Sequence, residues 1–234
     1  MAVIKRNSLS GLVGPVVVYT MNGQQIIRAR PRHHKKSKAS RDAAKQFGLA
    51  SRISSGLRHL LHMMLHGINQ KKTRYRFDAA IREWLNDKQA INDSNNTFLL
   101  LRRFLFNEKI ALTESLRAQP TVEWVQPGKI VVRVPALVPA RDMVAPADAT
   151  SVQWFFTFVW VHANGAGGSA SVHELAIPYN NQKRAAQTFE KSASFQTDQL
   201  AVATLRLRYV TGDGNILMDE KWLPAGVIGT CYFE

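Results

Sequence analysis

The amino-acid sequence predicts an α+β protein in which an N-terminal β-hairpin and a basic helical region precede an antiparallel β-sandwich of the immunoglobulin-like or jelly-roll-like kind. An Asn-Gly pair separates two apolar runs near the N-terminus. Apolar residues recur at spacings of three and four between residues 43 and 68, and Gly and Pro separate short apolar runs after residue 120. We therefore expect a hairpin and basic arm over residues 1–39, a helical domain over 40–119 and the sandwich over 120–234.

Residues 16–19 and 25–28 flank the Asn22-Gly23 pair, and both of these turn residues tolerate positive φ. The pattern predicts a two-stranded ribbon. An isolated hairpin is only marginally stable in water, so its strands must be completed by the rest of the chain or by strand addition from a neighbouring subunit. The residues expected at such an interface are Val16, Val18, Tyr19 and Ile26.

The N-terminal quarter of the chain also carries a longer pattern of small, apolar and basic residues. It consists of Leu9-Ser10-Gly11-x-x-Gly14-x-x-Val17-Val18-Tyr19-x-x-Asn22-Gly23, then Arg28-x-Arg30-Pro31, then Phe47-Gly48-x-Ala50-Ser51 leading into Leu57-Arg58. This pattern resembles the start of a family of uncharacterised bacterial proteins. The resemblance implies a Gly-rich ribbon followed by a basic segment and a helix, and it carries over no activity and no catalytic residue.

The formal charge of +14 is concentrated in the first half of the chain. Residues 1–120 hold 22 Lys and Arg against 7 Asp and Glu, whereas residues 121–234 hold 9 against 10. The densest basic segment consists of Arg28, Arg30, Arg32, Lys35, Lys36, Lys38, Arg41 and Lys45. Such a segment binds nucleic acid or another polyanion through counterion release, or it is a solvated arm that contacts an acidic protein, and charge alone does not separate these interpretations.

Ser40 is the expected N-cap of a long helix, with Asp42 in its first turn. An apolar seam with one polar substitution, Ser54, runs along this helix through Ala43, Phe47, Ala50, Ser54, Leu57, Leu61, Met64 and Ile68. This seam requires a partner, and segments 73–88 and 98–106 are candidates. The seam forms either the core of a small helical domain or an intermolecular helix pair.

Three histidines, His59, His62 and His66, share one side of the same helix. Their spacing permits zinc binding, but no acid lies between Asp42 and Asp78 to orient the imidazoles. The interpretation we favour places them beside the apolar seam, with no metal bound.

The second half predicts strands over 129–134, 152–162, 170–177, 200–210, 216–222 and 227–233. The alternation in residues 205–209 places Leu205, Leu207 and Tyr209 inward and Arg206 and Arg208 outward, and residues 212–215 form the turn of a hairpin.

One predicted strand has two apolar faces. Trp154, Phe156, Phe158 and Trp160 lie on one side, and Phe155, Val159 and Val161 lie on the other. The first set suits the sandwich core, and the second is covered either by the helical domain or by another subunit. Phe155 and Val159 therefore join the expected interface residues. An aromatic ligand platform is an alternative interpretation.

The sequence contains none of the readable hydrolase, nucleotide-binding or metalloprotease motifs, and its one cysteine, Cys231, cannot form an intramolecular disulfide or a cysteine metal cluster. No apolar run approaches the roughly 20 residues of a membrane span. The first residues lack the pattern of a secretory signal. We therefore expect no cofactor and a protein in the cytoplasm or in a particle assembled there.

We expect a non-enzymatic structural or assembly protein that joins copies of itself, or other subunits, through its hairpin and apolar surfaces. A phage-type virion or tail component and an intracellular filament both suit this design. The alternative is a nucleic-acid-binding module that uses residues 28–45. An enzyme with a site between the domains is a third hypothesis, which a pocket with converging acids, histidines or a metal would favour.

Overall fold

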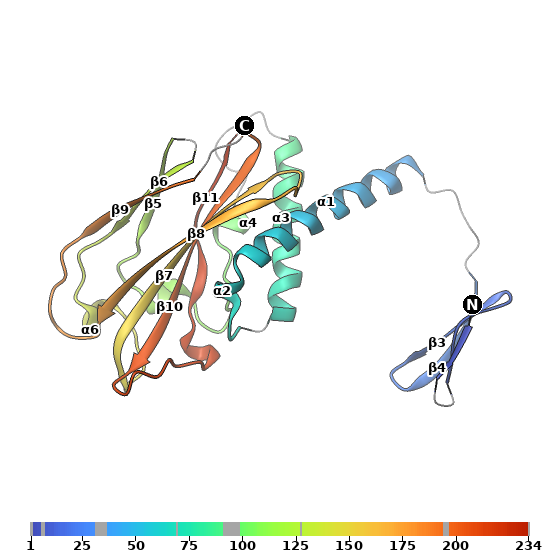
Figure 1. Ribbon diagram of the computed structural model, residues 1–234, viewed down its shortest axis with the longest axis horizontal. Coiled ribbons are helices and arrows are strands. Elements are labelled where there is room, and N and C mark those ends of the chain that lie inside the picture. Colours follow the sequence, from blue (N-terminus) through green and yellow to red (C-terminus); the bar gives the residue numbers. More distant parts are fainter. Residues whose placement is uncertain are drawn as a thin grey trace. The chain divides into compact units, whose positions relative to one another are not determined.

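The computed structural model describes residues 2–5, 8–30, 37–68, 70–90, 99–126, 128–193 and 197–233. The chain divides into two compact units, Met1–Asp42 and Ala43–Glu234. The first unit contains an antiparallel sheet, and the second contains helices followed by further antiparallel sheets (Figure 1), so the α+β class is confirmed. From Ala43 onwards, the helices of the region 40–119 lie in the same compact unit as the strands that follow them.

The first unit contains four strands in sequential order, β1 (Ala2–Lys5), β2 (Ser8–Val13), β3 (Val16–Met21) and β4 (Gln24–Ala29). The predicted hairpin is formed by β3 and β4, and its turn residues Asn22 and Gly23 have φ angles of 51° and 79°. Positive φ at both positions defines the turn type that matches strand twist. The sequence-based prediction missed β1 and β2, and Gly11 lies inside β2 and pairs with Val18.

The helices are α1 (Lys38–Leu60), α2 (His62–Leu65), α3 (Gln70–Ala90), α4 (Leu99–Arg102) and α5 (Leu112–Ser115). The first of them begins before the predicted position. The hydroxyl of Ser37 accepts a hydrogen bond from the backbone N–H of Ser40 at 3.1 Å, so Ser37 has the capping role expected of Ser40. None of the described helices combines the length and the apolar character needed to cross a membrane.

The strands of the second unit form two sheets. One has the order β5 (Thr121–Gln126), β6 (Lys129–Val134), β9 (Gln187–Ser192), and the other has the order β11 (Ala225–Phe233), β10 (Gln199–Thr211), β7 (Ala149–His162), β8 (Gly168–Pro178). All neighbouring strands are antiparallel. Lettered A to G in chain order, the seven strands form the sheets A-B-E and G-F-C-D, which pack face to face as a β-sandwich.

Five of the six predicted strands are confirmed, and the strand predicted over 216–222 is wrong. Asp219 accepts a hydrogen bond from the backbone N–H of Lys221 and begins the short 3-10 helix η1 (Glu220–Trp222), so this segment belongs to a loop that returns to β11. Strands β5 and β9 were not predicted. The short helix α6 (Pro139–Asp142) lies in the connection from β6 to β7.

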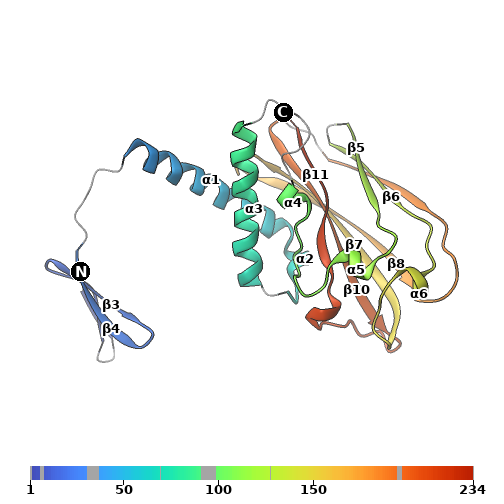
Figure 2. The same cartoon turned by 180° about the vertical axis from the view of Figure 1, so that it is seen from behind.

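Strand β7 separates two hydrophobic cores. Its inward side chains pack between the two sheets, and on its other face Val159 and Val161 pack with helix residues such as Ile53 and Trp84. The second unit therefore has three layers, with the helices on the outer face of the larger sheet (Figure 2). This face was expected to be covered either by the helical domain or by another subunit. At Val159 and Val161 it is covered by helices of the same chain.

The alternation predicted in β10 is confirmed for Leu205, Leu207 and Tyr209, which are all fully buried between the sheets. Both arginines point to the opposite face, as expected, but neither extends into open solvent. Arg206 is 2% exposed, and burial followed by the nearby charge of Arg208 lowers its pKa to about 10. Arg208 is half-buried against Phe155.

Candidate functional site

The predicted basic segment is exposed wherever the structure describes it. Arg28 and Arg30 lie on β4 and directly after it, and Lys38, Arg41 and Lys45 lie on the first turns of α1. The guanidinium of Arg28 lies 5.3 Å from the centre of the Tyr19 ring, which is a cation–π contact between neighbouring strands. Arg32, Lys35 and Lys36 lie outside the described residues.

The four interface residues predicted on the hairpin lie on both faces of the four-stranded sheet. Val16 and Val18 share one face, and Tyr19 and Ile26 share the other, because side chains alternate along a strand and these residues pair across β3 and β4. Among residues 10–30 and 37–42, the part of this unit whose side-chain burial the structure describes, Val18 is the one buried hydrophobic residue. Val16, Tyr19 and Ile26 are partly exposed.

The two interface residues predicted on β7 are covered within the chain itself. Val159 is fully buried in the core between the sheet and the helices. Phe155 is 8% exposed, and the Arg208 guanidinium lies 3.8 Å from the centre of its ring. These two side chains therefore present no surface to another subunit, because helices and an arginine of the same chain already pack on this face.

The outward side of α1 carries a row of basic residues. Lys45, Arg52 and His59 are all exposed and are spaced seven residues apart. A spacing of seven turns the position by only about 20° around a helix, so the three side chains lie on one stripe. Each step along the stripe is about 10 Å at 1.5 Å per residue. The sequence-based prediction included only Lys45, at one end.

The stripe ends at a surface hollow of about 260 Å³ between α1, α2 and α3. We call this the α1–α3 hollow. Its lining residues are Ser55, Arg58, His59, His62, Leu65, Thr73 and Arg74. Four of these seven carry basic side chains and none is acidic, so the hollow suits an anion.

One carboxylate, that of Asp78, lies near both arginines of the hollow. Ser54, which is fully buried, donates a hydrogen bond from its hydroxyl to Asp78 Oδ1, and Arg58 Nε donates to the Ser54 hydroxyl at 3.4 Å. Arg58 Nη2 and Arg74 Nε each lie 3.9 Å from an Asp78 oxygen. These distances are longer than a hydrogen bond, so Asp78 attracts both guanidinium groups without accepting a hydrogen bond from Arg58 Nη2 or Arg74 Nε.

The predicted histidine stripe is only partly present. His59 and His62 both line the hollow, with ring centres 6.4 Å apart, and His62 Nδ1 is 3.0 Å from the backbone oxygen of His59. His66 lies beyond the end of α2 and is exposed. Within the described ranges, no cluster of three or more His, Cys, Asp or Glu side chains is arranged to hold a metal ion.

A second, smaller hollow of about 190 Å³ lies farther along the same pair of helices. It is lined by Ala43, Gln46, Phe47, Arg82, Leu85 and Asn86. Phe47, predicted as part of the apolar seam, is 59% exposed here, and the guanidinium of Arg82 lies 5.6 Å from the centre of its ring. The seam becomes buried only from Ala50 onwards.

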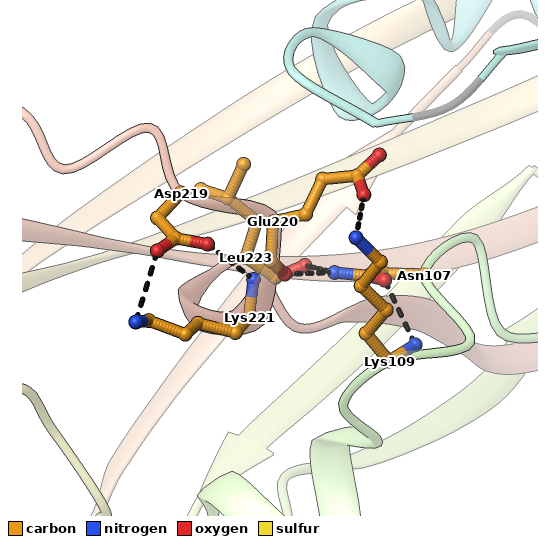
Figure 3. A network of polar contacts seen from close by, with 6 residues as sticks. All are labelled: Asn107, Lys109, Asp219, Glu220, Lys221 and Leu223. Carbon is orange, nitrogen blue, oxygen red and sulfur yellow. Dashed lines mark hydrogen bonds and ion pairs between the residues drawn. The ribbon is translucent and has the colours of Figure 1, made fainter.

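A polar network fixes the loop that joins β10 to β11 (Figure 3). Asn107, which is 3% exposed, donates from Nδ2 to the backbone oxygens of Glu220 and Leu223. Its Oδ1 accepts from the backbone N–H of Lys109, and the Lys109 ammonium forms an ion pair with the Glu220 carboxylate. This network connects the segment after α4 to η1 and supports the fold rather than a binding site.

The sequence-based prediction missed Arg58 and Arg74 as site residues. The available signal was charge: the face of α3 that carries Lys71 and Arg74 also carries a single acid, Asp78, four residues after Arg74. What the sequence lacked was the position at which α1 crosses α3. Comparisons of the sequence with protein-family models, with curated proteins and with solved structures gave no significant match, so the resemblance of the N-terminal segment to a bacterial family stays a prediction.

Proposed function

We propose that this protein is a non-enzymatic assembly subunit that associates with copies of itself, or with other subunits of a larger particle, through the four-stranded sheet of its first unit. A virion or tail component of phage type, or an intracellular filament, is the setting that we propose. The observation that carries the proposal is that this sheet has apolar side chains on both faces, of which only Val18 is buried among residues 10–30.

The strand register assigns the exposed apolar residues to the two faces. Val13, Val16 and Ile27 share the face of Val18, and Ile27 is 66% exposed. The opposite face carries Leu12, Val17, Tyr19, Met21 and Ile26, and Met21 is 55% exposed.

A single sheet layer becomes stable when a second layer covers one of its faces. A second copy of the same sheet supplies a matching apolar face, and packing about a twofold axis buries Ile27 and its neighbours on both copies. Because the other face is also apolar, layers can be added on both sides, which leads from a dimer to a filament or a particle. The cationic side chain of Arg28 on the edge strand β4 disfavours strand addition between two copies at that edge.

The test is sedimentation of the purified, nuclease-treated full chain across concentration in low and high salt. We expect concentration-dependent association that persists in high salt, because apolar burial is not screened. The variant Ile27→Lys is expected to weaken the association at least about tenfold, since it places a charge on the buried face. Gln187→Lys adds the same charge at an exposed position of β9, outside the four-stranded sheet, and is the matched control. A monomer at every concentration, or equal association of both variants, contradicts the proposal.

The second candidate function is nucleic-acid binding through residues 28–45. The exposure of Lys38, Arg41 and Lys45 on one continuous helix favours it. If this segment neutralises about five phosphates, the affinity for duplex DNA falls with a log-log salt slope of about −4 to −5. A flat salt response eliminates this candidate.

A further inference from the structure

We infer that the α1–α3 hollow is a phosphate-binding site whose principal ligands are Arg58 and Arg74. The inference is independent of the assembly proposal and of the basic segment 28–45, because every lining residue lies between Ser55 and Arg74. The chemistry recognised is the phosphate group, either free or as a phosphodiester of a nucleic-acid strand.

The arrangement of the two arginines is the first argument. Arg58 and Arg74 come from different helices and both line the hollow, and each lies 3.9 Å from a carboxylate oxygen of Asp78. The arginine fork matches the oxygens of a phosphate and forms two parallel hydrogen bonds with it. One carboxylate balances one of the two positive charges, so the pair retains a net charge of +1.

Burial is the second argument. The Arg58 side chain is only 21% exposed, and its Nε donates to the hydroxyl of the fully buried Ser54. An arginine held in this way loses little conformational freedom when an anion binds, so more of the interaction free energy appears as affinity. The Arg74 side chain is 58% exposed and supplies the charge at the open side of the hollow.

The surroundings of the hollow extend the positive charge. Lys71 lies on α3 one turn before Arg74, and Arg52 lies on α1 one heptad before His59, and both are exposed. The exposed Glu83 lies about 120° around α3 from Lys71, on a different side of the helix. A chain of phosphates can therefore continue from His59 in the hollow to Arg52 on α1.

The experiment compares the full-length, nuclease-treated protein with the double variant Arg58→Gln/Arg74→Gln. The first probe is a fluorescein-labelled 20-nucleotide single strand, followed by anisotropy at several salt concentrations. We expect the double variant to bind about tenfold more weakly, with a salt slope smaller by about 0.7 for each phosphate that it no longer neutralises. The matched control, Arg133→Gln/Lys183→Gln, removes the same charge from exposed sites on the sandwich and is expected to bind like the wild type.

The second probe is inorganic phosphate at matched ionic strength, with the Tm as readout. Phosphate that raises the Tm of the wild type and the control, but not of the double variant, assigns free phosphate as the source. If the double variant binds the oligonucleotide more weakly but phosphate does not raise the Tm of the wild type, the ligand is a phosphodiester. Arg74→Gln alone, at the more exposed position, serves if the double variant does not fold.

The inference is overturned if the double variant and the control bind both probes equally, or if neither probe binds the wild type. The sedimentation of the double variant is expected to equal that of the wild type, because the substitutions lie outside the four-stranded sheet. A failure of the phosphate site is therefore distinguishable from a failure of the assembly proposal.

Discussion

The guanidinium of Arg208 stacks on the ring of Phe155, with Cζ 3.8 Å from the ring centre, and Nη2 donates to Gln153 Oε1 at 3.0 Å. Arg208 lies on β10, and the other two residues lie on β7. The cation thus covers the part of the outer sheet face where Phe155 is located.

Replacing Arg208 tests this covering. We expect Arg208→Lys to lower the free energy of unfolding by about 1–2 kcal/mol. The lysine ammonium is not planar, so it cannot stack on the Phe155 ring and donate a hydrogen bond to Gln153 at the same time. Urea denaturation measures the change. The control is Arg133→Lys on the exposed face of β6, and a loss of the same size in both variants contradicts a specific role for the stack.

His173 makes stability depend on pH. Its ring stacks on Phe189 with centres 3.9 Å apart, and burial, followed by the charge of Lys191, lowers its pKa. Because the folded-state pKa lies below that of the unfolded chain, the neutral imidazole stabilises the fold at pH above the unfolded value, and this contribution is lost as the pH falls through the folded value.

We therefore expect the urea midpoint to decrease between pH 8 and pH 5 and the variant His173→Gln to show a smaller decrease. The exposed His66→Gln is the matched control. A pH profile of His173→Gln that coincides with that of the wild type is the result that contradicts this prediction.

Asn107 anchors the loop before β11. Asn107→Ala leaves the backbone oxygens of Glu220 and Leu223 without this donor, and we expect a loss of about 1–3 kcal/mol. Hydrogen exchange of residues 219–223 should accelerate in the same variant. Lys109→Ala, which removes the exposed ion pair, is expected to have a much smaller effect on both measurements.

A substitution at Val159 tests whether the outer face of β7 is covered by helices of the same chain or by another subunit. Val159→Asp buries an unpaired carboxylate between the sheet and the helices, and we expect a loss of at least about 3 kcal/mol. Val172→Asp on β8 is the control, since Val172 shares this face and is 45% exposed. If instead Val159→Asp folds normally and only prevents association, the helices are not the layer that covers β7.

Much of the fold was predictable because it is encoded in local periodicity. The Asn22-Gly23 turn, the seam through Leu57 and the alternation of Leu205 and Leu207 each reflect the geometry of one element. The strand predicted over 216–222 failed because its apolar run ends after Met218, and Asp219, which favours a turn, caps the 3-10 helix that follows.

The candidate site was less predictable. Lys45 could be identified from charge density, but Arg58 and Arg74 are sixteen residues apart and converge only because two helices cross. Phe155 and Val159 were assigned to an interface because the sequence does not show that helices and an arginine of the same chain cover them. The tertiary fold decides which helix packs on which face of a sheet, so this packing cannot be predicted from the pattern of residues within one element.

The double-sided strand β7 also has a consequence for synthesis on the ribosome. Leu57 on α1 emerges 102 residues before Val159, whose core it shares. At roughly 5–20 residues per second, the apolar side of α1 waits for on the order of 10 s before its sheet exists. During that interval the nascent helices are a natural substrate for chaperones, and slow translation of the segment between α3 and β7 prolongs their exposure.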